Sequence, residues 1–163
     1  MGNQWRSPLE SRCTTPRAEP MTWLDYVDDG APSVAAFASW LSQLHPSVRR
    51  DLVVKIDALR ALAAAGDIVI SGDDAVDQLA AIRADPDLYE LRWTLLTKVV
   101  RQYHGEPPED GDLLVALHMH IKGDTTLLRR GGQRRISNQP AEIARAVRRY
   151  RDGHESAWTT DRG

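Results

Sequence analysis

Three neighbouring apolar-rich runs between positions 88 and 122 constrain the fold of this chain more than any other feature. In the first run, residues 88–95, apolar and polar side chains alternate with the period of two that is typical of a half-buried β-strand. The third run, residues 113–122, repeats this alternation, and its polar side carries two histidines and a lysine. We therefore expect strands that offer one face to a core and place cationic or titratable groups on the other.

Helical patterns flank these runs. Apolar residues recur every three or four positions in two earlier segments, which predicts two antiparallel helices that meet at His45-Pro46, the second ending at Gly66. The expected elements, in chain order, are an edge strand at 21–27, helices at 33–44 and 46–65, a further helix at 73–84, strands at 88–95, 98–103 and 113–122, and a helix at 139–153. This order predicts an α+β fold with a small antiparallel sheet of about four strands, packed against the two N-terminal helices.

Length and composition set the domain organisation. A chain of 163 residues suits one domain of roughly 100 to 150 residues with loose ends. We expect a flexible N-terminal tail over 1–20, a domain over 21–153 and a frayed C-terminal tail over 154–163. Cys13 is the only cysteine, which excludes an intramolecular disulfide and gives no cysteine-based zinc site. No run reaches the ~18 apolar residues of a membrane span and no signal peptide is recognised, so we expect a cytoplasmic protein.

Charge is unevenly distributed along the chain. The net charge is only -2, but residues 122–151 contain nine basic residues and two acidic ones. Such asymmetry suggests a side that faces a polyanion. The arginines that we expect to contact RNA are Arg129, Arg130, Arg134, Arg135, Arg145, Arg148 and Arg149. The alternative is that the basic helix surface is merely solvated.

The polar side of the expected strands has groups suited to RNA cleavage without a metal or another cofactor. Such cleavage needs a base, an acid and a fixed positive charge. His118 and His120 lie two apart on one face, and their ordinary pKa of about 6.5 suits proton transfer at neutral pH. Arg92 presents a planar fork to phosphate oxygens, and Lys122 could share that role. We expect these four side chains to converge in one electropositive concavity.

Each of these groups also has a plainer interpretation. His118 and His120 could be polar groups on a solvent-exposed sheet face. Arg92 could pair with Glu90 on the same strand face. A metal site formed by both histidines and His104 has suitable spacing, but no aspartate or cysteine lies beside them on these strands.

Taken in order, four signals resemble the RelE/ParE toxin superfamily, and specifically its phage-derived Gp49-like branch, which includes the HigB toxins. The resemblance covers roughly residues 21–152. The signals, which accompany the paired helices, are Tyr89-Glu90-Leu91-Arg92, the strand Val99-Val100-Arg101-Gln102-Tyr103, the apolar strand Leu113 to Lys122 that ends in a lysine, and Asn138-Gln139-Pro140 before the terminal helix.

The resemblance implies a RelE-like fold and a toxin of a type II toxin-antitoxin module. Such a toxin binds the ribosomal decoding site and cuts messenger RNA, and a helix-turn-helix antitoxin of the Xre type neutralises it. By position, Arg92, Arg101 and Lys122 correspond to cationic positions on the family's concave active face. Two features depart from the pattern: Gly123 replaces a second lysine, and an arginine-rich insertion follows. Two alternatives remain, namely a gyrase poison similar to ParE and a non-catalytic phage-derived binding protein.

Overall fold

A five-stranded β-sheet forms the centre of the computed structural model, which describes residues 6–26, 32–122, 126–127, 134–135 and 139–158. The strands follow the spatial order β1-β5-β4-β3-β2. Their bounds are β1 Thr22–Asp25, β2 Leu79–Ala81, β3 Leu88–Leu95, β4 Lys98–Gly105 and β5 Leu113–Lys122. β1 is parallel to β5, and all other neighbours are antiparallel. A separate pair, β6 Thr126–Leu127 and β7 Arg134–Arg135, is described by its backbone only.

The α+β class predicted from the sequence is confirmed, but the expected sheet differs in two ways. It has five strands rather than about four, and it is mixed because β1 runs parallel to β5. The helix expected over 73–84 is wrong, since β2 pairs with β3 there. The Asp77 carboxylate accepts hydrogen bonds from the Ser71 and Gly72 backbone amides, which favours a tight loop in place of the helix.

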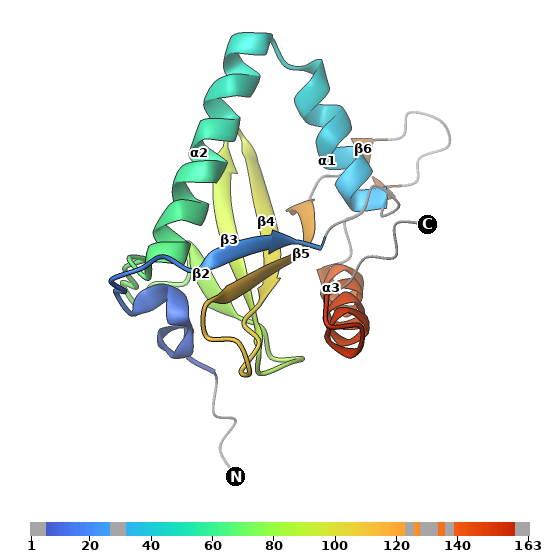
Figure 1. Cartoon of the computed structure of the whole chain (residues 1–163). Coiled ribbons are helices and arrows are strands. Elements are labelled where there is room, and N and C mark those ends of the chain that lie inside the picture. The colour runs from blue at the N-terminus through green and yellow to red at the C-terminus, as the bar shows by residue number, and fades with distance from the viewer. Residues whose placement is uncertain (1–5, 27–31, 123–125, 128–133, 136–138, 159–163) are drawn as a thin grey trace.

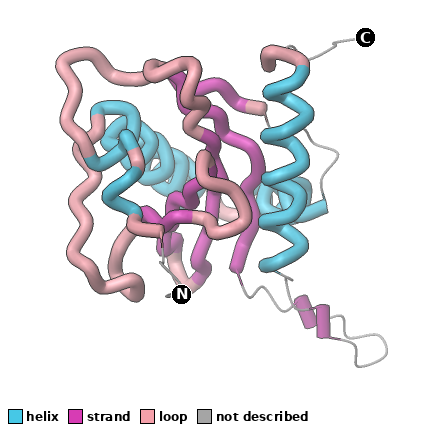
Figure 2. Tube along the Cα trace, turned by 90° about the horizontal axis from the view of Figure 1, so that it is seen from below, coloured by secondary structure: helices cyan, strands magenta, loops and turns pink. Residues whose placement is uncertain are grey.

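Three α-helices surround the sheet: α1 Pro32–Gln43, α2 Pro46–Ala65 and α3 Gln139–Glu155. The predicted end of α2 at Gly66 is confirmed, because this residue adopts the left-handed φ of 73° that favours glycine. α1 and α2 diverge from their connection, and α2 and α3 lie on opposite sides of the sheet (Figures 1 and 2). The sheet is therefore covered by a helix on both faces.

Each face of the sheet has its own apolar core. On the α2 side, Leu52 and Leu59 pack against the strands through residues such as Leu91. On the α3 side, Val147 and Tyr150 pack over one end of the strands. Because burial of each large apolar side chain contributes about 1.5 to 3 kcal/mol, both helices are held firmly to the sheet.

Residues 6–20 pack against the domain instead of forming the expected flexible tail. They contain two short 3-10 helices, η1 Pro8–Glu10 and η2 Arg12–Thr14. The Cys13 side chain is fully buried. The Arg6 and Arg12 guanidiniums donate to backbone carbonyls of the loops around residues 82–88 and 107–113. The low apolar content of this segment led us to expect no packing. Its arginine side chains and the buried Cys13 thiol hold it against the domain.

The C-terminal end is also attached further than expected. α3 continues to Glu155, and the Trp158 ring packs edge-on against Tyr26 at a centroid distance of 5.7 Å. Residues 159–163 lie outside the described residues. None of the helices in the described part of the chain is both long and apolar enough to cross a membrane.

Candidate active site

Polar side chains from three adjacent strands share the α3 side of the sheet. Strand register arranges them in two cross-strand rows, because directly paired residues point to the same face. The rows are Arg92, Arg101 and His120, and then Glu90, Tyr103 and His118. The register brings together four of the residues singled out from the sequence, namely Arg92, Arg101, His118 and His120.

A single carboxylate holds both arginines. Glu90 Oε1 accepts from Arg92 Nε at 2.6 Å and from Arg101 Nη1 at 2.7 Å. The Glu90 side chain is 2% exposed and that of Arg101 7% exposed, so this is a buried ion pair. The predicted pairing of Arg92 with Glu90 is therefore confirmed, and Arg92 additionally reaches Asp74 Oδ1 at 3.0 Å.

Tyr103 and the two histidines form a second cluster beside the ion pairs. The Tyr103 hydroxyl lies 2.8 Å from His120 Nε2, within hydrogen-bond distance. The three rings lie in nearly parallel planes, with Tyr103 tilted by 6° from His118 and by 20° from His120. This stacking fixes the ring orientations, so that a proton could pass between Tyr103 and His120 without rearrangement.

α3 covers this cluster. His118 Nε2 contacts Glu142 Oε2 on α3, and the same carboxylate oxygen accepts from Ser33 Oγ of α1 at 2.6 Å. His118 is 0% exposed and His120 1% exposed. The alternative of a solvent-exposed histidine face is therefore wrong, because α3 docks on this face. The sequence pattern alone did not reveal this docking.

Burial changes the protonation of the cluster. It lowers the pKa of His120 to about 4 and also lowers that of His118, although Glu142 opposes both shifts. Both imidazoles are therefore neutral at pH 7. Burial raises the pKa of Tyr103, so its hydroxyl keeps its proton. Burial alone would lower the pKa of Arg92, but the Glu90 and Asp74 carboxylates raise it overall.

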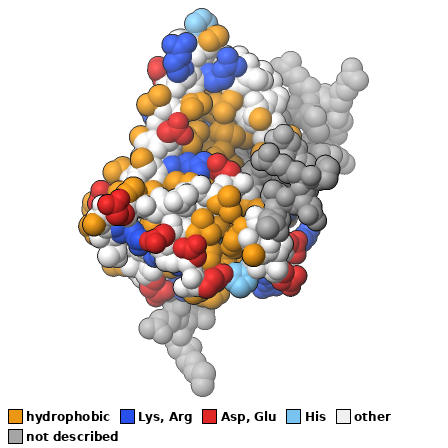
Figure 3. All heavy atoms as spheres, viewed as in Figure 1, with side chains coloured by type: hydrophobic (Ala, Val, Ile, Leu, Met, Phe, Trp, Pro, Cys, Tyr) orange, Lys and Arg blue, Asp and Glu red, His pale blue; other side chains and the backbone are white. Residues whose placement is uncertain are grey.

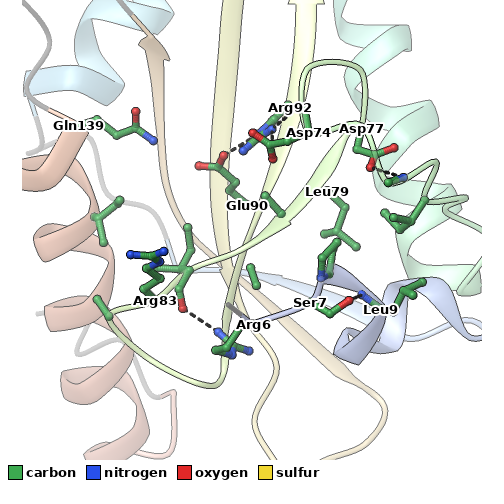
Figure 4. Close-up of a pocket in the computed structure, with 18 of the residues that line it drawn as sticks. Arg6, Ser7, Leu9, Asp74, Asp77, Leu79, Arg83, Glu90, Arg92 and Gln139 are labelled. Atoms are coloured by element: carbon green, nitrogen blue, oxygen red, sulfur yellow. Dashed lines mark hydrogen bonds and ion pairs between the residues drawn. The ribbon is translucent and has the colours of Figure 1, made fainter. Parts of the chain in front are cut away.

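A cavity of about 900 Å³ opens beside the ion pairs, along β2 and the first turn of α3. Glu90, Arg92 and Gln139 line it at one end, and Arg6 and Arg83 lie at the other (Figure 4). Arg92 is thus the member of the cationic row that borders open space. The expected convergence of Arg92, His118, His120 and Lys122 in one electropositive concavity is wrong. Of these four side chains only Arg92 lines the cavity, where Glu90 and Asp74 pair with it. Both histidines are buried beneath α3 instead.

The remaining predicted cationic residues of β5 and α3 do not belong to this cluster. Lys122 is exposed at the end of β5, two residues beyond His120 on the same face. On α3, Arg149 Nη1 donates to the Leu117 carbonyl at 2.8 Å, whereas Arg148 is exposed. Positive charge from Arg145 also acts on the pKa of His118.

Four predicted RNA contacts fall in the insertion between β5 and α3. Arg129 and Arg130 lie outside the described residues, and for Arg134 and Arg135 only the backbone is described. On the face seen in Figure 3, lysine and arginine side chains are interspersed with acidic ones. The described part of that face therefore shows no continuous basic surface.

His104 is separated from the other two strand histidines. It pairs with Tyr89 in the register and stacks on that ring on the α2 side, because successive strand residues point to opposite faces and Tyr103 points to the α3 side. A metal site that combines His104 with His118 and His120 is therefore wrong.

Sequence reasoning missed two members of the cluster. No role in proton transfer was predicted for Tyr103. No role in the site was predicted for Glu142. A buried acid on a helix that docks against two histidines has no signal in the strand pattern, so only the tertiary structure reveals it.

No protein-family model, curated protein or solved structure matches this chain. What the cluster can do must be inferred from its own residues and their geometry.

Proposed function

We propose that this protein is a toxin of a type II toxin-antitoxin module that cleaves messenger RNA on the ribosome without a metal ion. Its partners would be the ribosome, messenger RNA and a neutralising helix-turn-helix antitoxin of the Xre type. The proposal combines the resemblance to the HigB-containing branch of the RelE/ParE superfamily with the chemistry of the α3-side cluster.

One observation carries the proposal: two arginines and two neutral histidines lie on one face of the sheet, and Arg92 at the edge of this group lines an open cavity. In the proposed reaction, the ribose 2'-hydroxyl gives its proton to a neutral histidine and attacks the adjacent phosphorus. The bond to the 5'-oxygen breaks, and that oxygen takes a proton from an acid such as the Tyr103 hydroxyl. Arg92 and Arg101 would stabilise the charge on the phosphate oxygens.

The covered histidines place a condition on this reaction. A phosphodiester cannot reach His118 or His120 while α3 lies over them, since each is at most 1% exposed. The proposed active form therefore has α3 displaced from β5. Its opening would break the contact between His118 and Glu142 and the hydrogen bond from Ser33. Binding to the ribosome would supply the free energy for this displacement.

The test is to induce wild-type protein and the Arg92→Ala variant in cells and to map messenger 5' ends. Cuts in phase with codons that disappear in the variant are expected. Arg50→Ala, which removes an exposed arginine of α2, is the matched control and should retain the cuts. Growth arrest with intact messengers and a DNA-damage response would instead indicate a gyrase poison similar to ParE.

A second candidate is a non-catalytic, phage-derived binding protein. The complete burial of both histidines and the pairing of Arg92 and Arg101 with Glu90 favour it, because such groups also serve as purely structural polar networks. For this candidate, induction should cause neither growth arrest nor messenger cleavage.

A further inference from the structure

A second cluster of buried polar side chains lies on the opposite side of the sheet from the candidate active site. Cys13 comes from η2, and His104 and Glu106 come from the end of β4 and the residue after it. All three are buried, with exposures of 0%, 0% and 6%. The proposed RNA cleavage makes no use of them, and nothing in the chain's linear pattern brings them together.

Three potential ligand atoms of this cluster converge. Cys13 Sγ lies 3.7 Å from His104 Nε2 and 3.5 Å from Glu106 Oε1, and these nitrogen and oxygen atoms are 3.2 Å apart. Zinc bound tetrahedrally at its usual distances of about 2.0 to 2.3 Å would separate such atoms by roughly 3.3 to 3.6 Å. The triangle of donors therefore already has nearly the size that a zinc ion requires.

We propose that Cys13 Sγ, His104 Nε2 and a Glu106 carboxylate oxygen bind a divalent transition-metal ion, with Zn²⁺ as the best fit. A thiolate, an imidazole and a carboxylate are typical zinc ligands. On binding, the thiol releases its proton to solvent, and the neutral imidazole carries its ring proton on Nδ1. The Ser11 hydroxyl donates to Glu106 Oε1 at 2.5 Å and so helps to orient this carboxylate.

The geometry distinguishes this site from a nucleophilic triad. In a cysteine or serine triad, the nucleophile and the acid contact different nitrogens of the histidine ring. Here Cys13 Sγ and Glu106 Oε1 both lie against Nε2, so the ring cannot relay a proton from one to the other. Complete burial also excludes a substrate from the thiol. Convergence on one point suits a chelated ion.

The surroundings hold the ligands in place. The His104 ring packs edge-on against Trp23 at 5.4 Å and stacks on Tyr89 at 5.9 Å. The Arg12 amide donates to Glu106 Oε2 at 2.9 Å. An ion here would join the N-terminal segment to the end of β4, which suits a structural role rather than a catalytic one.

The test is to unfold the full chain in a chelator, refold it with Co²⁺ and record the absorption spectrum. A near-ultraviolet thiolate-to-cobalt charge-transfer band is expected, and it can arise only from Cys13 because the chain has one cysteine. Refolding with Zn²⁺ should give one ion per chain by elemental analysis. A refolded wild-type protein without the band overturns the proposal and leaves a hydrogen-bonded cluster only.

Variants localise the ion. Cys13→Ser and Glu106→Gln should each weaken metal binding by at least about 100-fold, since even the outer partners of metal ligands account for 10- to 100-fold. His154→Gln is the matched control, because it removes an exposed histidine paired with Glu109 and should leave affinity unchanged. Equal binding by wild type and Cys13→Ser would overturn the proposal. The wild-type spectrum decides the matter even if a variant does not fold.

Discussion

Arg101 and Glu90 form a buried ion pair across two antiparallel strands, with Arg101 Nη1 2.7 Å from Glu90 Oε1. Removing two charges from water costs several kcal/mol, which close and hydrogen-bonded geometry must offset. The same carboxylate oxygen accepts from Arg92, so one acid positions both arginines of the proposed phosphate-binding row. Glu90 is therefore a positioning residue for the candidate active site.

Replacement of Glu90 by leucine should lower the free energy of unfolding by about 3 to 5 kcal/mol, because it leaves Arg101 buried without a counter-charge. Urea denaturation measures the change. The double variant Glu90→Leu with Arg101→Met removes both charges and should recover most of the lost stability. A loss below about 1 kcal/mol in the single variant would mean that the pair is exposed to solvent.

Stability should decrease as the pH falls from 6.5 to about 4.5. The pKa of His120 is about 4 in the folded protein and near 6.5 when unfolded, so the unfolded chain binds more protons in this range. The lowered pKa of His118 acts in the same direction. The free energy of unfolding should fall by about 2 to 3 kcal/mol over this range. Urea denaturation at each pH measures it.

His120→Gln provides the control for this pH dependence, since its slope between these pH values should be shallower than that of the wild type. The Glu142 and Glu106 carboxylates also have a lowered pKa, but their contribution is lost only below their ordinary value of 4.5. An unchanged slope in His120→Gln would show that this imidazole is solvated.

The contact between His118 and Glu142 should control access to the histidines. Glu142→Ala removes the acceptor for both His118 and Ser33, and loss of a charged hydrogen bond of about 1.5 to 3 kcal/mol should raise the open population roughly 10- to 100-fold. Diethylpyrocarbonate modification of His118, located by peptide mass spectrometry, measures this population. His118 of the Arg148→Ala variant should be modified at the wild-type rate. If His118 of the Glu142→Ala variant were modified equally slowly, this contact would not control access.

Gly66→Ala should test how residues 6–20 pack on α2. A Cβ at this position would lie 1.9 Å from the Thr15 carbonyl oxygen, and the φ of 73° already disfavours other residues. We expect a loss of more than about 2 kcal/mol in thermal or urea unfolding. Gly111→Ala is the matched control, because its Cβ would meet no atom within 4 Å. Similar stability for both variants would show that the N-terminal segment does not pack at the end of α2.

The strands β3 and β5 and the long helices could be predicted because each carries a periodic apolar pattern. The pattern at Val76, Leu79 and Ile82 has helical spacing, but Leu79 and Ile82 instead serve β2 and the residue after it, while Val76 is 66% exposed. The hydrogen bonds that Asp77 accepts from the preceding loop outweigh that spacing, and such hydrogen bonds produce no periodic pattern in the sequence.

The candidate site was only partly predictable for a related reason. Strand periodicity places Arg92, His118 and His120 on the polar faces of their strands, since alternating apolar and polar residues show to which face each side chain points. It does not report what covers that face, because exposed and helix-covered polar faces alternate alike. The cover depends on Glu142 meeting His118 across α3 and β5, and the cluster of Cys13 with His104 depends on how the N-terminal segment packs.

The most direct test of the central claim is messenger cleavage by purified protein on translating ribosomes. We predict cleavage by the wild type and a decrease of about 10²- to 10³-fold in Arg92→Ala, because a positioned charge on the phosphate is lost. Glu142→Ala should cleave at least as fast as the wild type, since its histidines are more accessible. Intact messenger with folded wild-type protein, or equal cleavage by wild type and Arg92→Ala, would contradict the proposed function.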